Sequence, residues 1–144
     1  FTGLGAPYWK SDVRAILCGM SRSTGRAELV KAAEECIAYQ IADVVNAMGG
    51  ESGVKISELR VDGGPTRDSF LMQFQSDILN IPVAVPEKEE LSGIGAAYAA
   101  GIAVGLYDKS IFSRMSHVRF VPAMSSLERE KRYGGWKAAV NMLL

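Results

Sequence analysis

The stretch ELRVDGGPTRDSFLMQFQSDIL, from Glu58 to Leu79, decides the fold that we expect for this chain. Leu59 and Val61 are typical of a short strand, and the glycine pair and proline within Asp62–Pro65 are a strong turn signal. The apolar residues behind the turn recur at helical spacing and predict a helix with one buried face: Phe70, Leu71, Phe74, Ile78 and Leu79. The expected unit is therefore a strand, a tight turn and a helix.

The glycine pair of this turn, Gly63 and Gly64, is a candidate ligand site. Because glycine has no Cβ atom, another molecule can contact the backbone at this pair. The start of a helix also offers free N–H groups that favour a phosphate. Thr66 and Asp68 stand where side-chain oxygens cap a helix, and Asp62 either contacts magnesium or a nucleotide or caps the backbone. A plain connection between strand and helix uses the same residues, so a phosphate site and a packing turn both fit.

The residues before this unit predict a strand and a long helix. Val13–Met20 alternates partly and predicts a strand that is buried at Ile16, with Leu17 as a second buried candidate. A 3.6-residue repeat predicts a helix over Ala27–Met48, with Gly49–Gly50 as its C-terminal cap. The charged residues of that helix fall largely off its apolar stripe: Glu28, Lys31, Glu34, Glu35 and Asp43. Glu34 and Glu35 are neighbours that point in different directions, and we expect both in solvent.

The residues after the unit predict a strand at Ile81–Val85, a charged loop at Glu87–Glu90 and a helix at Ser92–Gly105. This helix is rich in glycine and alanine, which lets another backbone come close, either in tight packing on the sheet or at a domain that moves against it. The rest is expected as a loop over Lys109–Pro122, with an extended piece VRFVP, and a last helix over Leu127–Leu144. Alternating strands and helices indicate an α/β domain whose ligands bind at the carboxyl ends of strands.

Composition narrows the class of protein. The 144 residues are enough for one domain with a real core, and 16 basic and 16 acidic side chains cancel, which argues against nucleic acid or an anionic membrane as the main partner. Cys18 and Cys36 lie in apolar segments and are expected as buried thiols in a reducing cytoplasm. Because the chain starts at Phe1 in a loop-like stretch, we expect it to be a piece of a longer protein.

Side chains for catalysis are scarce. His117 is the only histidine, and we expect it on a surface loop, so neither a catalytic triad nor a histidine-rich metal site can be assembled. Tyr8, Trp9 and Trp136 are expected to pack rather than to bind a substrate. We therefore assign no catalytic residue and no metal ligand in this chain, and the glycine turn stays the one candidate site.

Several segments, in order along nearly the whole chain, resemble the C-terminal part of the FGGY family of carbohydrate kinases. The region from Gly19 to Gln40 resembles a signature of that family. The segments that carry the resemblance are FTGLGAPYW (Phe1–Trp9), ILCGM to ECIAYQ (Ile16–Gln40), LRVDGG (Leu59–Gly64), LMQFQSDIL (Leu71–Leu79), IPV (Ile81–Val83), GAAYAAGIAVG (Gly95–Gly105) and EREKRYGGWKAAV (Glu128–Val140).

The resemblance implies a partial ribonuclease-H-like domain of the actin/hexokinase type, with a mixed, mostly parallel sheet flanked by helices. Residues 1–144 would be the nucleotide side of the protein, with an N-terminal catalytic domain upstream. It further implies ATP and Mg²⁺ as cofactors, with Gly63 and Gly64 near the α-phosphate and adenosine. Asp68 stands where the family often has Asn near the adenine, and a carboxylate can accept a hydrogen bond there but cannot donate one. The small-residue helix would then face the other domain.

The function implied is phosphorylation of a polyol or sugar hydroxyl by ATP, with glycerol as the first candidate. The general base and the substrate-binding residues of the family belong to sequence upstream of Phe1, so we expect this chain to be inactive alone. The alternative is a non-catalytic actin-like module for nucleotide binding or assembly. We also expect a cytoplasmic protein that forms homo-oligomers and binds neither nucleic acid nor membrane.

Overall fold

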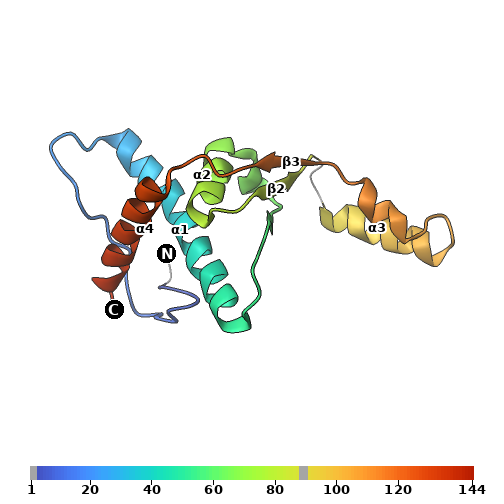
Figure 1. Cartoon of the computed structure of the whole chain (residues 1–144), viewed down its shortest axis with the longest axis horizontal. Helices are drawn as coiled ribbons and strands as arrows, with labels where there is room; N and C mark the ends of the chain where they lie inside the picture. Colours follow the sequence, from blue (N-terminus) through green and yellow to red (C-terminus); the bar gives the residue numbers. More distant parts are fainter. Residues whose placement is uncertain (1–2, 88–90) are drawn as a thin grey trace.

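The structure is a computed structural model that describes residues 3–87 and 91–144. Four α-helices, two short 3₁₀ helices and three strands make up these residues (Figure 1). In chain order they are α1 (Arg26–Ser52), β1 (Leu59–Arg60), η1 (Gly64–Arg67), α2 (Ser69–Leu79), β2 (Val83–Pro86), α3 (Leu91–Ala103), η2 (Lys109–Arg114), β3 (His117–Phe120) and α4 (Ser126–Asn141). Within these described ranges, no helix combines the length and apolar character that crossing a bilayer requires.

The sheet has the order β1-β2-β3 and is mixed. β1 runs parallel to β2, with Leu59 beside Val83, whereas β3 returns antiparallel and places Phe120 beside the same Val83. The expected mixed sheet is confirmed, but its antiparallel pair is the longer one, because residues 118–120 of the extended piece VRFVP lie in β3. Val83 at the centre is fully buried, so β2 is the strand on which the core is built.

The core lies between α1, α2 and β2. Leu71, Phe74 and Ile78 of α2 are buried against Ala38, Tyr39 and Ala42 of α1 and against Val83 and Val85. The predicted buried face of α2 is therefore confirmed at its centre, while Phe70 in the first turn stays exposed. The ring of Phe74 meets the ring of Tyr39 edge to face at 5.4 Å, a favoured aromatic arrangement.

The predicted strand Val13–Met20 is wrong for this structure. The segment is irregular, Ile16 and Leu17 are 41% and 64% exposed, and Cys18 is exposed rather than buried. No backbone group from residue 11 to residue 20 makes a backbone hydrogen bond with another described residue. A strand needs a neighbour to satisfy its backbone, and this segment has none among residues 3–87 and 91–144.

The stop predicted at Gly49–Gly50 is also wrong, because α1 continues to Ser52. Gly53 provides the cap: it adopts the left-handed conformation (φ 66°), and its N–H donates to the carbonyl of Gly49. Two glycines inside the helix cost about 1 kcal/mol each relative to alanine, which the packing of a 27-residue helix outweighs.

The segment 109–122 is more ordered than the predicted loop, since it forms η2 and β3, and His117 lies half-buried in a strand. α3 and η2 together form an arm at one end of the long axis of the molecule (Figure 1). Tyr98 of α3 packs against Tyr107 and Phe112, and the ring of Tyr107 covers Gly101 so closely that a Cβ there would lie 2.3 Å from it. Glu87 is exposed, and the rest of the predicted charged loop, 88–90, lies outside the described residues.

Candidate functional site

The glycine turn lies at the carboxyl end of β1, where the N–H of Val61 still donates to the carbonyl of Ala84 on β2. Gly63 has φ 102° and ψ 174°, a conformation that side-chain-bearing residues rarely adopt. At Gly64 a Cβ would meet no atom within 4 Å, and both glycines are exposed. The turn therefore presents open main chain to a ligand.

A single 3₁₀ turn, η1, separates the glycines from α2, which begins only at Ser69. Thr66 closes the turn: its N–H and its hydroxyl both donate to the carbonyl of Gly63, at 3.0 and 2.7 Å. The amides of Gly63 and Gly64 precede this first bonded amide and stand where a helix start leaves its donors open. The helix start at the glycines is therefore that of η1, with Gly63 as its N-cap and Gly64 as its first residue, and not that of α2.

Asp68 is the N-cap of α2. Its Oδ1 atom accepts a hydrogen bond from the N–H of Leu71 at 3.1 Å, which confirms the capping role expected from its position. Thr66, the other expected cap, bonds to Gly63 instead. The cap holds the Asp68 carboxylate one helical turn away from the glycines, so the two features expected at a nucleotide site lie on one continuous segment.

The charged residues around the turn do not form a metal cage. Asp62 is exposed, and the part of the chain that the structure describes contains no group of three His, Cys, Asp or Glu side chains able to hold a metal ion. Glu58, just before β1, pairs with Arg60 at 3.1 Å and with Arg119 of β3 at 2.6 Å. These contacts tie the outer strands to each other and leave the glycine turn clear.

A second polar cluster, the Asp43 junction, consists of Asp43 on α1, Tyr8 in the N-terminal loop, and Tyr133, Trp136 and Lys137 on α4. Asp43 is 2% exposed. Its Oδ2 accepts from the hydroxyl of Tyr8 (2.9 Å) and from the indole N–H of Trp136 (2.7 Å). Its Oδ1 accepts from the hydroxyl of Tyr133 and pairs with the Lys137 ammonium at 2.8 Å. The junction thereby joins three segments that are far apart in sequence.

Burial alone would raise the pKa of Asp43, but the hydrogen bonds from Lys137, Tyr133, Trp136 and Tyr8 outweigh it and lower that pKa. The same partnership raises the pKa of Lys137 against the effect of its own burial. Both groups therefore stay charged at neutral pH. A buried charge is tolerated in a fold when it is paired and fully hydrogen-bonded, which is the situation of Asp43.

Sequence reasoning missed this junction, because Asp43 falls off the apolar stripe of α1. The signal lay in a second face of the helix: Tyr39 and Asp43 are four residues apart, so they lie one above the other. Both are buried, since α4 covers this side of α1, and the rings of Tyr39 and Trp136 stack at 5.4 Å. Of the three residues expected to pack, Trp136 and Tyr8 do so, whereas Trp9 is 78% exposed.

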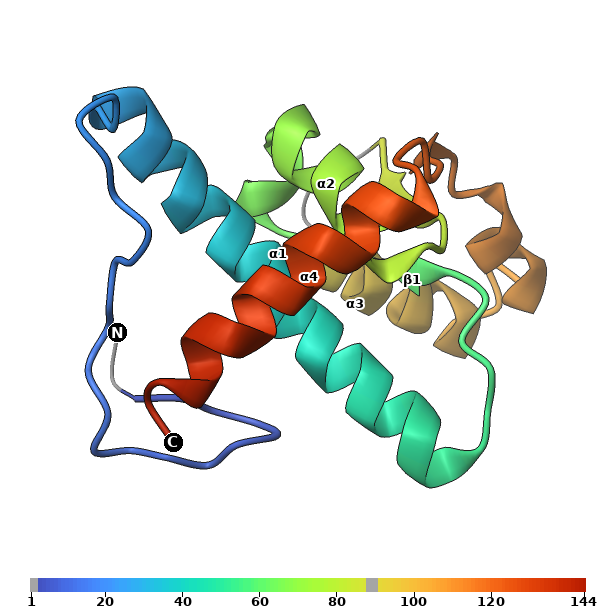
Figure 2. The same cartoon turned by 60° about the vertical axis from the view of Figure 1, so that its left-hand side comes forward.

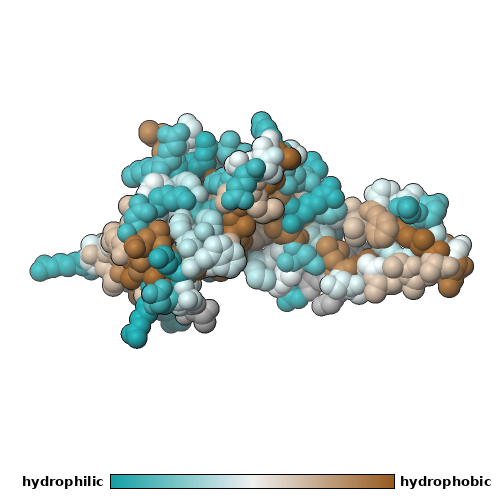
Figure 3. All heavy atoms as spheres, turned by 90° about the horizontal axis from the view of Figure 1, so that it is seen from below, coloured by the Kyte–Doolittle hydropathy of each residue, from teal (hydrophilic) through white to brown (hydrophobic). Residues whose placement is uncertain are grey.

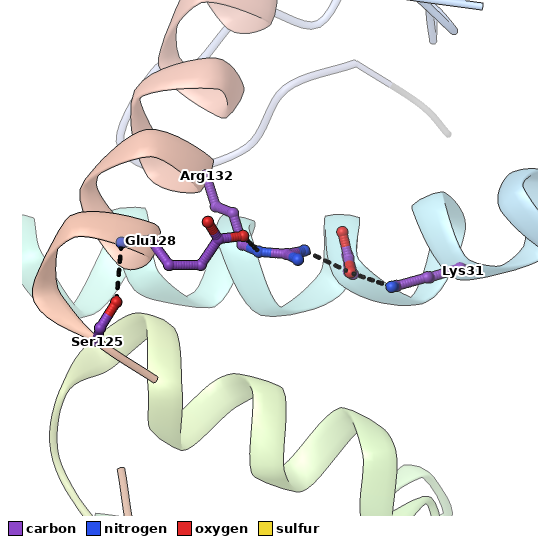
Figure 4. Close-up of polar contacts among 5 residues, drawn as sticks. Lys31, Ser125, Glu128 and Arg132 are labelled. Carbon is purple, nitrogen blue, oxygen red and sulfur yellow. Dashed lines mark hydrogen bonds and ion pairs between the residues drawn. The ribbon is translucent and has the colours of Figure 1, made fainter. Parts of the chain in front are cut away.

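A chain of ion pairs on the surface joins the same two helices (Figure 4). Arg132 of α4 binds Glu128 at 2.6 Å and Glu35 of α1 at 3.2 Å, and Lys31 lies 3.7 Å from Glu35. The hydroxyl of Ser125 caps α4 by accepting from the N–H of Glu128. Glu35, expected in solvent, is thus a bridge between α1 and α4.

Comparisons with known proteins converge on one family. The model of the FGGY family of carbohydrate kinases, C-terminal domain, matches residues 1–104. Glycerol kinase of Brachyspira hyodysenteriae is 53% identical over 143 residues, covering 97% of this chain and 29% of that protein. Glycerol kinase of Bacillus velezensis is 47% identical over 144 residues, covering 98% of this chain and 29% of its own length.

Solved structures agree with the sequence relatives. The crystal structure of Plasmodium falciparum glycerol kinase with ADP matches 100% of this chain and 29% of its own, with a TM-score of 0.89 and 37% identity. A xylulose kinase from Brucella ovis matches 96% of this chain and 30% of its own, with a TM-score of 0.75 and 26% identity. The expected actin/hexokinase-like fold is thereby confirmed, and this chain spans about 29% of the length of the curated relatives. Since the family model covers well over half of the residues, the chain belongs to the FGGY family of carbohydrate kinases.

Proposed function

We propose that this chain is the nucleotide-side part of a kinase that transfers a phosphoryl group from ATP to a hydroxyl of a polyol or sugar, with glycerol as the first candidate. The observation that carries the proposal is the open main chain of Gly63 and Gly64 at the carboxyl end of β1. Relatives named glycerol kinase, one of them crystallised with ADP, support the nucleotide and the acceptor.

In the proposed complex, the amides of Gly63 and Gly64 donate to the phosphate and ribose region of ATP. An added Cβ at Gly64 would occupy open space, so the turn fits a ligand that must approach the backbone. Asp68 accepts a hydrogen bond from the adenine amino group while its Oδ1 keeps the N-cap of α2. Mg²⁺, when bound, would neutralise phosphate charge.

The remaining parts of the reaction belong to a proposed N-terminal domain. Phosphoryl transfer depends mainly on positioning and on stabilising charge within a closed cleft, and a carboxylate commonly accepts the proton of the attacking hydroxyl. Among the carboxylates that the structure describes, Asp43 is the most deeply buried, and it is bound by four donors of its own and is not available as a base. We therefore expect no turnover by this chain alone.

The proposal includes self-association and a cytoplasmic location. Hydrophobic residues lie on the surface of the α3–η2 arm, at the right-hand end of Figure 3, among them Val104, Leu106 and Phe112. Surfaces of this kind mark contacts with other chains, so we expect the isolated chain to associate. Cys18 and Cys36 are free thiols, which fits a reducing compartment. A concentration-independent monomer in light scattering would contradict the association.

The test is an assay of ADP release by the full-length protein with ATP and a panel of polyols and sugars. We expect turnover with at least one small polyol, glycerol first, and none by the 144-residue chain alone. Turnover by the chain alone would contradict the placement of the catalytic groups. Nucleotide-dependent polymerisation of the full-length protein without turnover on any acceptor would support the assembly module instead.

A further inference from the structure

Three side chains of α2, which we call the α2 clamp, hold the segment that joins β3 to α4: Gln73, Ser76 and Asp77. Gln73 lies three positions before Ser76 and four before Asp77, so the three side chains share one side of the helix. The segment that they hold, residues 120–124, runs from β3 past α2 to α4 (Figure 1). None of the three side chains belongs to the glycine turn or to the Asp43 junction.

Asp77 is the centre of the clamp. It is 8% exposed, and its Oδ1 accepts hydrogen bonds from the N–H groups of Ala123 (2.7 Å) and Met124 (3.1 Å) and from the side-chain amide of Gln73 (3.0 Å). Among the residues that the structure describes, no lysine or arginine pairs with this carboxylate. A buried carboxylate is costly without such hydrogen bonds, so its position against the two backbone amides is closely fixed.

The other two clamp residues bind the carbonyl groups of the neighbouring strands. Ser76 is fully buried, and its hydroxyl lies 2.9 Å from the carbonyl oxygen of Ile81, before β2, and 3.0 Å from that of Phe120, the last residue of β3. The amide of Gln73 also donates to the carbonyl of Val121 at 2.9 Å. The clamp therefore adds directional hydrogen bonds to the apolar packing that holds α2 on the sheet.

The held segment is itself anchored at both ends. At one end, Phe120 pairs with Val83 at the centre of the sheet. At the other end, α4 lies across α1 and is bound there by the Asp43 junction (Figure 2). The segment is thus a fixed support, and the clamp sets the position of α2 against it.

The glycine turn lies between the two elements whose relative position depends on the clamp. Before the turn, the N–H of Val61 donates to the carbonyl of Ala84, which ties the end of β1 to β2. After the turn, η1 leads directly into α2 at Ser69. The ladder fixes β1 to β2, and the clamp fixes α2 to β2 and β3. A shift of α2 would therefore change the course of the backbone through Gly63 and Gly64.

We propose that Asp77, through the α2 clamp, is a positioning residue for the nucleotide. It holds α2 where the amides of Gly63 and Gly64 meet the phosphate and ribose region of ATP. The inference rests on the proposed function, because it takes the glycine turn as the nucleotide contact. A displacement of about 1 Å caused by a residue far from the chemistry can cost an enzyme about 100-fold, so Asp77 can act on the nucleotide without touching it.

A matched pair of substitutions at Asp77 tests this role. All three hydrogen bonds of Asp77 go to Oδ1, and no described residue binds Oδ2, so asparagine can keep the three bonds whereas alanine removes them. In calorimetric titration of the full-length protein with ADP, we expect Asp77→Ala to bind about fivefold more weakly or worse, and Asp77→Asn to bind within about twofold of the wild type. Equal affinity of Asp77→Ala and the wild type would overturn the proposal.

Steady-state kinetics separate positioning from lost stability. We expect the KM for ATP to rise in Asp77→Ala by about the same factor as the ADP dissociation constant, whereas the KM for the acceptor stays unchanged. Unfolded molecules would lower only the apparent kcat. A lowered kcat with both KM values unchanged would show that Asp77 only stabilises the fold.

Two further variants complete the experiment. Asp43→Ala breaks another buried carboxylate network, one that does not include α2, and should lower stability while ADP binds as in the wild type. Ser76→Ala removes only a hydroxyl, so it tests the clamp even if Asp77→Ala does not fold, and we expect ADP to bind it about threefold more weakly. Unchanged affinity in Ser76→Ala, or an equal loss of affinity in Asp43→Ala, would overturn the proposal. A wild type that does not bind ADP would instead overturn the proposed function, and the positioning role with it.

Discussion

The Asp43 junction and the glycine turn differ in how their hydrogen-bonding groups are used: those of the junction bind one another, whereas the backbone amides of the turn stay open. At the junction, side chains from α1, α4 and the N-terminal loop satisfy one another and leave Asp43 2% exposed. At the turn, Gly63 and Gly64 carry no side chain and stay exposed, with their amides ahead of the first bonded amide of η1. The hydrogen bonds of the junction stabilise the fold, whereas the amides of the turn stay available to a ligand.

This contrast predicts that substitutions at the two places separate stability from binding. A change at the junction lowers the free energy of unfolding and leaves a nucleotide contact in place, since the two sites lie on different elements. A change at the turn weakens nucleotide binding and leaves the free energy of unfolding unchanged, because no described atom lies within 4 Å of the Cβ position of Gly64. The following substitutions run from the largest expected loss to the smallest.

Asp43→Ala is expected to lower the free energy of unfolding by about 3 kcal/mol, the range for breaking a buried pair on one side. It leaves Tyr133 and Trp136 without their acceptor and Lys137 without its counter-ion. Urea denaturation followed by circular dichroism measures the loss. Glu51→Ala, on the exposed end of the same helix, is the control and should change stability by less than about 0.5 kcal/mol. Equal effects of the two variants would contradict the role of the junction.

The pH dependence of stability also reports the contribution of the Asp43 carboxylate. The pKa of Asp43 is lowered in the fold below its ordinary 3.8, so the unfolded chain takes up the proton first. Its contribution to stability is therefore full above about pH 4 and is lost as the pH falls through the lowered pKa. Asp43→Asn should lose less stability than the wild type between pH 7 and pH 2, measured by denaturation at each pH. The same loss in both proteins would show that Asp43 does not titrate in this way.

Asp68→Ala is expected to cost about 1 kcal/mol of stability, because α2 loses its N-cap. Asp68→Asn is the matched control: asparagine caps equally well, so stability should stay within about 0.5 kcal/mol of the wild type. In the full-length protein, Asp68→Asn also adds a hydrogen-bond donor near the proposed adenine site. We expect this donor to change the relative affinity for ATP and GTP, which calorimetry measures. Unchanged stability in Asp68→Ala would contradict the capping role.

Arg132→Met is expected to have the smallest effect, about 0.5 kcal/mol, because ion pairs at the surface contribute little and are screened by salt. The difference from the wild type should shrink in 1 M salt, measured by thermal unfolding. A loss of several kcal/mol would mean that the chain of ion pairs, rather than the buried junction, holds α4 on α1.

Local patterns predicted the strand, turn and helix around Gly63–Gly64, because alternation, turn residues and helical spacing are read from neighbouring positions. These patterns failed where a segment distant in the sequence determines whether a residue is buried or a strand is paired. Asp43 is buried only because α4, about 90 positions later, brings Tyr133 and Trp136 to it. The strand at Val13–Met20 fails for the complementary reason, since among the described residues it has no neighbour to pair with.

The most direct test is a calorimetric titration of the full-length protein with ADP, using the wild type, Gly64→Val and Gly50→Val. Gly64 and Gly50 are both exposed, both have open space at the Cβ position and neither has a left-handed φ, so valine is tolerated at each. We predict that Gly50→Val binds as the wild type does, while Gly64→Val binds at least tenfold more weakly, about 1.4 kcal/mol, with unchanged unfolding stability. Equal affinity of all three proteins for ADP would contradict the claim that the bare main chain of this turn contacts the nucleotide.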